Sequence, residues 1–233
     1  MEPLQIYFPF GPPIGYAELP KELVNDFNKG CDNIVKDKEL SKSEDWSHNL
    51  VGQVEQEFLI PKDVINKWGR WLGTQVRTYV TGYFNQLYIS EQNILGASKE
   101  QVTQAISRTK TSVQSAWYIR SFVGDYNPIH IHTDCELSCV GFLKVPDLSK
   151  ERKKHKADPN RSPAGALEIL SNSGSNEKAF FENDRISFTP KVGNWYLFPA
   201  NLRHTAYPFR CDGERRSFSI NMNTNIFKGV TDK

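Results

Sequence analysis

Two segments that lie far apart in the sequence carry residues that could bind one metal ion together. The first is His132-Thr133-Asp134, and the second contains His204 and, further along, Arg215. Two imidazoles and a carboxylate are the ligands of a mononuclear non-haem iron(II) centre that keeps open coordination positions, and a guanidinium can pair with both oxygens of a carboxylate. The sequence therefore predicts an iron centre made by His132, Asp134 and His204, beside a bound keto acid.

The placement of the histidines supports this prediction and adds an alternative ligand. The chain has five histidines, of which His130, His132 and His204 lie in strand-like segments, whereas the other two lie in polar ones. Side chains two residues apart in an extended strand point to the same side, so His130, His132 and Asp134 would share one face if the segment stays extended. His130 is therefore the alternative to Asp134 and would complete a three-histidine site.

Short strands are the elements expected to position these residues. Aromatic and β-branched runs between Gly, Pro and Asn turns predict strands in the second half of the chain, at 115–123, 137–145, 164–170, 185–188, 195–199, 205–209 and 217–221. Short strands at this frequency are typical of a sandwich or a barrel. Cys135 and Cys139, which accompany the apolar run, are expected to pack rather than to bind metal.

The first half of the chain reads as helical. A helix is expected from Pro20 to near Gly30, and a second from Pro61, with an apolar stripe formed by Val64, Trp68, Leu72, Val76 and Val80. Residues 98–112 give only a weak helical pattern. We expect one domain over 1–233, with a mostly helical supporting part at 1–112 and a β core at 113–225 that carries the metal site.

Composition limits the classes of partner. Lys and Arg total 29 and Asp and Glu 27, a net charge of +2 that argues against a nucleic-acid partner. No run of about eighteen apolar residues predicts a membrane span. The basic loop 148–163 is either a solvated connection or a lid or docking surface for an acidic partner. The four cysteines lack CxxC pairing and the N-terminus lacks signal-peptide features, which favours the cytoplasm, or the host cytoplasm if a phage encodes the protein.

Two longer stretches resemble a known enzyme family. Gly124-Asp-Tyr-Asn-Pro-Ile-His130-Ile-His132, followed by Leu137-Ser-Cys-Val140, is similar to the Gly-x-x-Asn-Pro-x-His-x-His and Leu-Ser-Gly-Val pattern of 2-oxoglutarate/iron(II) oxygenases that are common in marine bacteria and their phages. The second half of the family pattern resembles Lys191 to His204 and Asp212 to Asn221. The resemblance runs over about Trp117 to Asn221.

The resemblance implies a double-stranded β-helix, a jelly-roll barrel with iron at its mouth, and a prolyl-hydroxylase-like layout. It assigns His132 and His204 as imidazole ligands and Asp134 as the carboxylate ligand, although relatives often have glycine or another residue at the position of Asp134. The implied reaction consumes dioxygen and 2-oxoglutarate, releases succinate and carbon dioxide, and hydroxylates a small molecule or a peptide side chain such as proline.

Strand alternation selects the arginine for the keto acid. In 215–222 the polar set Arg215, Ser217, Ser219 and Asn221 alternates with Arg216, Phe218, Ile220 and Met222, so only one set can face a ligand. Arg215 is predicted to bind the distal carboxylate of 2-oxoglutarate, with Ser217 as a hydroxyl donor. Asn127 and Tyr118 are weaker candidates for contact with the keto acid or the substrate.

Two other functions fit parts of the same pattern. Glycine, histidine and glutamate spacing also approximates the cupin motifs, with His130, His132, Glu136 and His204 as ligands of an enzyme or metal-binding module that does not use 2-oxoglutarate. The other is a non-enzymatic virion or scaffold barrel, against which the intact set of ligand candidates argues.

Overall fold

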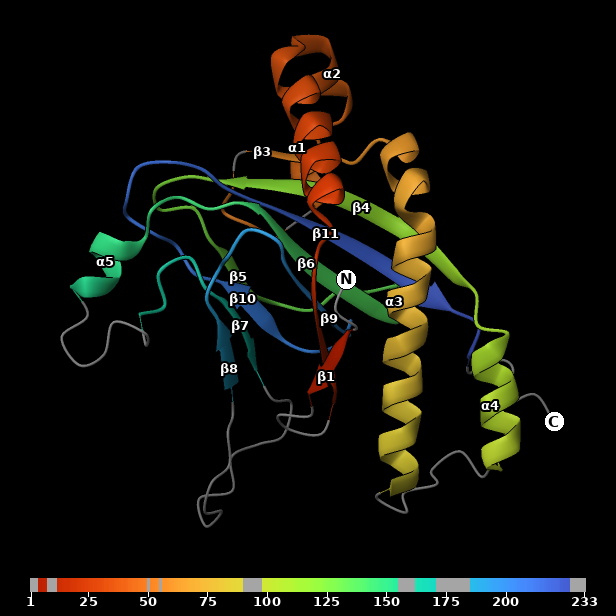
Figure 1. Cartoon of the computed structure of the whole chain (residues 1–233). Coiled ribbons are helices and arrows are strands. Elements are labelled where there is room, and N and C mark those ends of the chain that lie inside the picture. The colour runs from red at the N-terminus through yellow and green to blue at the C-terminus, as the bar shows by residue number, and fades with distance from the viewer. Residues whose placement is uncertain are drawn as a thin grey trace.

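The computed structural model describes residues 4–7, 12–49, 51–54, 56–89, 98–154, 162–170 and 185–226. The strands of these residues form two antiparallel sheets, and the long helices lie along one side of the larger sheet (Figure 1). Two antiparallel sheets of this kind are the architecture of a double-stranded β-helix, which confirms the expected fold class.

Each sheet combines strands that are distant in sequence. The larger has the spatial order β1 (Gln5–Tyr7), β2 (Ile14–Glu18), β9 (Asn194–Pro199), β6 (Leu137–Lys144), β11 (Arg215–Thr224), β4 (Thr111–Ser121) and β3 (Gln56–Leu59). The smaller has the order β5 (Asn127–His130), β10 (His204–Ala206), β7 (Leu167–Leu170) and β8 (Arg185–Phe188). Strands β1, β2 and β3 were not expected from the sequence, because they come from the half of the chain that reads as helical. They form the two edges of the larger sheet.

The helices are α1 (Lys21–Lys36), α2 (Lys38–Ser43), α3 (Lys62–Ile89), α4 (Lys99–Ser107) and α5 (Ser149–Lys153), with a 3-10 turn η1 (Ser47–Asn49). Helix α1 begins after Pro20, as predicted, but continues past Gly30. Gly30 serves a close contact there, because a Cβ atom at this position would lie 2.6 Å from the Tyr118 hydroxyl. The weak pattern of α4 is compensated by a capping box between Ser98 and Gln101.

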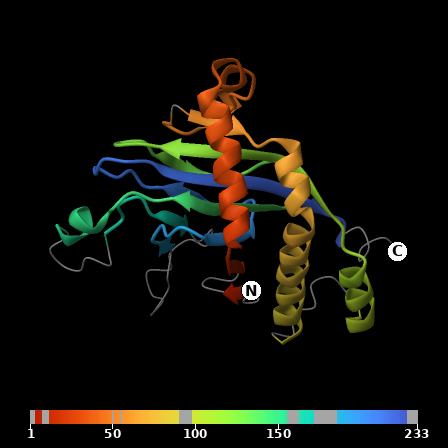
Figure 2. The ribbon, with the colours of Figure 1, turned by 45° about the horizontal axis from the view of Figure 1, so that its top comes forward.

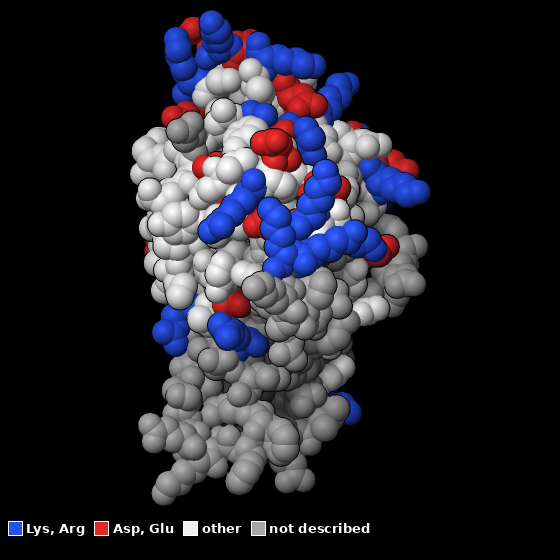
Figure 3. All heavy atoms as spheres, turned by 90° about the vertical axis from the view of Figure 1, so that its left-hand side faces the viewer, with Lys and Arg blue, Asp and Glu red and all other residues white. Residues whose placement is uncertain are grey.

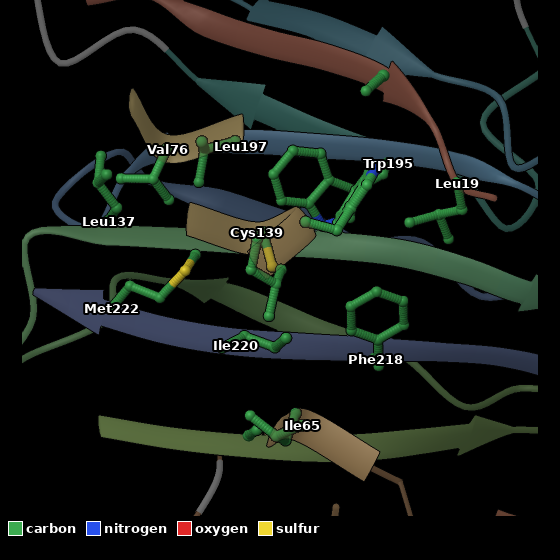
Figure 4. Close-up of a cluster of buried hydrophobic side chains, with 14 of the residues drawn as sticks. Leu19, Ile65, Val76, Leu137, Cys139, Trp195, Leu197, Phe218, Ile220 and Met222 are labelled. Atoms are coloured by element: carbon green, nitrogen blue, oxygen red, sulfur yellow. The ribbon is translucent and has the colours of Figure 1, made fainter. Parts of the chain in front are cut away.

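The main hydrophobic core lies between the helices and the larger sheet. Figures 1 and 2 show α1 and α3 running across this sheet, and Figure 4 shows side chains from β6, β9 and β11 meeting in the cluster. Phe218, Ile220 and Met222 are fully buried here, and so is Cys139, which confirms that this cysteine packs in the core. A smaller cluster with Phe142, Leu167, Ile169, Phe198 and Leu202 joins the two sheets to each other.

The predicted basic loop contains α5, while its residues 155–161 lie outside the described part of the chain. On the face that carries α5, Lys and Arg side chains lie among Asp and Glu side chains (Figure 3). Glu151 of α5 accepts a hydrogen bond from the backbone N–H of Arg210 at 2.8 Å, which ties the helix to this segment. None of the described helices is long and apolar enough to cross a membrane.

Substitution of Gly141 on β6 tests the packing on the face of the larger sheet that contacts the helices. A Cβ atom there would collide with the buried ring of Phe218, whereas one at the exposed Gly69 of α3 would meet nothing within 4 Å. We expect G141A to lower the free energy of unfolding by about 1–3 kcal/mol through overpacking. G69A should raise it by about 0.5–1 kcal/mol, because alanine favours the helix. Urea denaturation measures both, and an unchanged stability of G141A would contradict this packing.

Candidate functional site

A cavity of about 240 Å³ lies between the two sheets. Strands β4, β6 and β11 contribute its wall on the larger sheet, and His130, Leu167, His204 and Ala206 line it from the smaller sheet. Residues of the connection before β3, among them Trp46 and Gly52, complete the lining. The cavity is therefore the only described region where both candidate segments and the arginine strand meet one space.

Three histidines gather at the wall formed by the smaller sheet. His130 ends β5 and is paired directly with His204, the first residue of β10, and His132 follows β5 with its backbone N–H bound to Ala200 O at 2.9 Å. One ring nitrogen from each of the three lies within 4.8 Å of the others. The Nε2 atoms of His132 and His204 are 3.1 Å apart. This group is close enough to bind one metal ion.

Backbone carbonyl groups orient two of these rings. His204 Nδ1 lies 2.9 Å from Leu202 O, and His130 Nδ1 lies 2.7 Å from Pro128 O. A carbonyl oxygen can only accept, so each Nδ1 carries the proton and each Nε2 keeps a free electron pair. Fixing the tautomer in this way is the usual arrangement of histidines that bind a metal.

Burial keeps all three imidazoles neutral. It lowers the pKa of His132 to about 3, with a further contribution from His130, and it lowers the pKa values of His204 and His130. His204 is 3% exposed. Metal binding requires the unprotonated imidazole, so the site does not have to release protons from these rings at neutral pH.

The two carboxylates considered from the sequence do not join this group. The backbone at Asp134 is left-handed, with φ 61°, and the side chain is exposed. The alternation that brings His130 and His132 together therefore ends before Asp134, because the chain turns there. Glu136, the cupin candidate, instead accepts hydrogen bonds from the backbone and hydroxyl of Thr224, both at 2.6 Å.

Arg215 extends from β11 across the cavity to the smaller sheet. Its guanidinium donates to Gly165 O at 2.8 Å, Tyr207 O at 3.2 Å and Ser121 Oγ at 3.0 Å, and its Nε has no partner. Burial lowers its pKa to about 10, and Asp125 offsets part of this, so the group remains cationic at pH 7. No carboxylate among the described residues forms an ion pair with it. A buried cation in this state favours an anionic ligand.

The alternation along β11 is as the sequence predicted. Ser217, Ser219 and Asn221 line the cavity with Arg215, whereas Arg216 points to the helices and binds Glu214 at 2.8 Å and Asp32 at 2.8 Å. Of the two weaker candidates, Asn127 lines the cavity. Tyr118 packs against Phe27 and Phe218 on the opposite face of β4, and the structure does not bring it to the cavity.

The sequence gave no indication of one further cavity residue, Glu57 of β3. Its side chain is 1% exposed, neither carboxyl oxygen has a hydrogen-bond partner, and burial raises its pKa to about 8, with Asp45 and Asp125 adding to the rise. A glutamate in a short strand of Gln, Glu, Phe and Leu looks like an exposed polar position. Only the pairing of β3 with β4 places it inside.

The comparisons agree with this geometry. Residues 115–221 match the model of a family described as "Putative 2OG-Fe(II) oxygenase", and this range contains the three histidines, Arg215 and Ser217. A comparison with curated proteins found no match. The family uses iron(II) and 2-oxoglutarate.

Two solved structures share this fold at low sequence identity. AviO1 from Streptomyces viridochromogenes has a TM-score of 0.54 at 10% identity, with 93% of this chain and 91% of that chain covered. The non-haem alpha-ketoglutarate-dependent epimerase SnoN has a TM-score of 0.50 at 10% identity, covering 90% and 76%. A Pseudomonas putida prolyl-4-hydroxylase aligns with a TM-score of 0.46 at 13% identity, covering 90% and 91%.

The raised pKa of Glu57 predicts how stability depends on pH. A carboxyl with a pKa of about 8 in the folded state and 4.5 as its ordinary value binds its proton more tightly when folded. Its contribution to stability is therefore complete below pH 4.5 and is lost as the pH rises to about 8. The loss is at most about 1.4 kcal/mol per pH unit.

We expect the stability of E57Q relative to the wild type to rise with pH across this window and then to level off. Thermal unfolding between the two pH limits measures the difference. The control is E39Q, which removes a carboxylate whose side chain is 85% exposed. A pH profile of E57Q that runs parallel to that of the wild type would contradict the burial of an unpaired carboxyl.

Proposed function

We propose that this member of the 2OG-Fe(II) oxygenase family hydroxylates a C–H bond of a small molecule or a peptide side chain, using 2-oxoglutarate and dioxygen. The observation that carries the proposal is the buried guanidinium of Arg215, whose Nε has no partner and which forms no ion pair with a described carboxylate, in the same cavity as three neutral imidazoles. The three imidazoles suit a divalent cation and the guanidinium suits a dicarboxylate, and the reaction requires the protein to bind both.

The donor set fits both groups. His130, His132 and His204 would hold iron(II) through nitrogen atoms, and imidazole is a good ligand for iron. The unpartnered Nε of Arg215 would donate to the distal carboxylate of 2-oxoglutarate, with Ser217 beside it on the same face of β11. With Asp134 exposed, we infer the three-histidine set rather than a triad with that carboxylate.

Iron(II) and 2-oxoglutarate supply the oxidation: one atom of dioxygen enters the product hydroxyl, the other enters succinate, and the keto acid loses carbon dioxide. The chain orients these reactants. The carbonyl oxygens of Leu202 and Pro128 orient the rings of His204 and His130, and the Arg215 guanidinium would align the dicarboxylate. Val140, Phe142 and Leu167 form an apolar wall that excludes water from the reacting groups.

The first test is the dependence of 2-oxoglutarate binding on Arg215. We expect calorimetry on the anaerobic, iron-loaded protein to show binding, and R215K to weaken it by about 10- to 100-fold, because lysine cannot reproduce the planar pair of donors. The matched control is R216K, which makes the same change on the opposite face of β11 and should affect stability but not this affinity.

The same protein should convert 2-oxoglutarate to succinate in the presence of dioxygen, measured by mass spectrometry, and H204A should abolish this turnover. Binding of 2-oxoglutarate that is unchanged in R215K, or the absence of succinate with fully iron-loaded protein, would overturn the proposed function.

Metal content distinguishes the two ligand sets. We expect H130A, H132A and H204A each to lose most of the bound iron, measured by elemental analysis after dialysis, and D134N to retain it. Loss of one of three ligands removes a bond that the neighbouring groups cannot replace. The opposite result, with D134N losing iron and H130A retaining it, would identify Asp134 as the third ligand.

A further inference from the structure

The cavity has a second polar end that the proposed chemistry does not use. In the register of the larger sheet, Glu57 of β3 pairs with Ile119 of β4, and Ile119 pairs with Ser217 of β11. These residues form one row on the cavity face, and adjacent strands are about 4.8 Å apart, so Glu57 lies about 10 Å from the strand of Arg215 and Ser217. Ile119 lies between them in this row and also lines the cavity.

Two polar groups at this end lack hydrogen-bond partners, the Glu57 carboxyl and the side-chain oxygen of Asn127. Both carboxyl oxygens of Glu57 and Oδ1 of Asn127 are buried and have no hydrogen-bond partner. Two of these atoms lie beside Gly52, because a Cβ atom there would collide with Asn127 Oδ1 and lie 3.4 Å from Glu57 Oε2. A side chain at position 52 would fill the gap that the glycine leaves open. Asn127 Oδ1 and an ionised Glu57 carboxylate would both accept hydrogen bonds from a donor group placed in this gap.

The surroundings of Glu57 favour a donor with positive charge. Asp45 and Asp125 both add negative potential at its carboxyl group, and the only arginine or lysine that lines the cavity, within the described chain, is Arg215. Two indole rings also line this region: Trp46 packs against the cluster that contains Trp117, and Trp117 lies 5.6 Å from the His132 ring. Indole faces attract cations, and desolvated cation–π contacts are among the stronger ones.

We propose that Glu57, Asn127 and Trp46 form a subsite that binds an alkylammonium group of the substrate. This inference rests on the proposed function, and it names the substrate class as an amine that is cationic at neutral pH. The exposed apolar side chains of Val51 and Ile131 line the same cavity, so the carbon skeleton attached to the ammonium group has apolar contacts there. Trp117 and His132 line the same cavity and their rings are in contact, so a skeleton that packs against Trp117 is near the histidines.

The charge state of Glu57 gives the subsite a measurable property. In the empty cavity burial raises the pKa of Glu57 to about 8, so the carboxyl group is mostly protonated at pH 7. An ammonium ion beside it stabilises the carboxylate and lowers that pKa. Binding of the cation at pH 7 should therefore release a proton from the protein.

The test compares a cation with its neutral counterpart. Benzylammonium and benzyl alcohol are titrated by calorimetry into the anaerobic protein loaded with iron(II) and 2-oxoglutarate, at pH 7 in buffers of different ionisation enthalpy. We expect benzylammonium to bind at least about tenfold more tightly, since hydrogen bonds to charged groups are the stronger class, and to release close to one proton per site.

Two variants tie the preference to the subsite. E57Q keeps the shape of the side chain and should abolish both the preference and the proton release, whereas the exposed control E39Q should retain both. G52A fills the gap and should weaken benzylammonium without changing 2-oxoglutarate binding. If E57Q keeps the preference, or if the two compounds bind equally or not at all at millimolar concentrations, the subsite is wrong.

The two proposals fail separately. Iron and 2-oxoglutarate that bind normally, together with no ammonium preference, would contradict only the subsite. An absence of 2-oxoglutarate binding would contradict the proposed function instead, whatever the behaviour of the amine.

Discussion

The alternation of side chains along β11 is the constraint on which the rest of the structure depends. This strand is hydrogen-bonded to β4 on one side and β6 on the other, so its two faces cannot exchange without shifting both neighbours. One face gives Phe218, Ile220 and Met222 to the core beneath the helices, and the other gives Arg215 and Ser217 to the cavity. The packing of α1 and α3 therefore fixes the polar face as firmly as it fixes the apolar one.

Enclosure between two sheets sets the electrostatics of the cavity. Desolvation keeps the histidines neutral and holds the Glu57 carboxyl mostly protonated at pH 7. It also lowers the pKa of Arg215, which has no carboxylate partner among the described residues. Each of these states costs stability in the empty protein, since buried polar groups are normally paired. The contrast is Glu214, where burial would raise the pKa but hydrogen bonds from Arg120, Arg216 and Lys144 lower it to about 2. Glu214 does not line the cavity, whereas Arg215 and Glu57 line it without an ion-pair partner among the described residues, as expected if ligands supply those partners.

The fold alone leaves the reaction open. A similar barrel belongs to the epimerase SnoN, and one fold commonly hosts several chemistries through changes at the site. In this chain three histidines, and no described carboxylate, place a ring nitrogen near one point, and Glu57 lies in the same cavity on another strand than Arg215.

The sequence by itself determined most strands of the second half, the two faces of β11 with Arg215 toward the cavity, and the proximity of His132 to His204. Each of these depends on local periodicity or on residue type. It missed β1, β2 and β3, which are short and receive their hydrogen bonds from distant strands.

Tertiary structure alone decided the rest. The turn at Asp134 ends the extended segment, so the Asp134 side chain leaves the face shared by His130 and His132. The residue types around Asp134 do not predict its left-handed backbone. On β4 both faces are aromatic, so the sequence had no polar marker to show that Trp117 rather than Tyr118 faces the cavity. From the sequence, Glu57 reads as an exposed polar position. Only the pairing of the short edge strand β3 with β4 buries it, because burial depends on the assembled sheets and not on the segment alone.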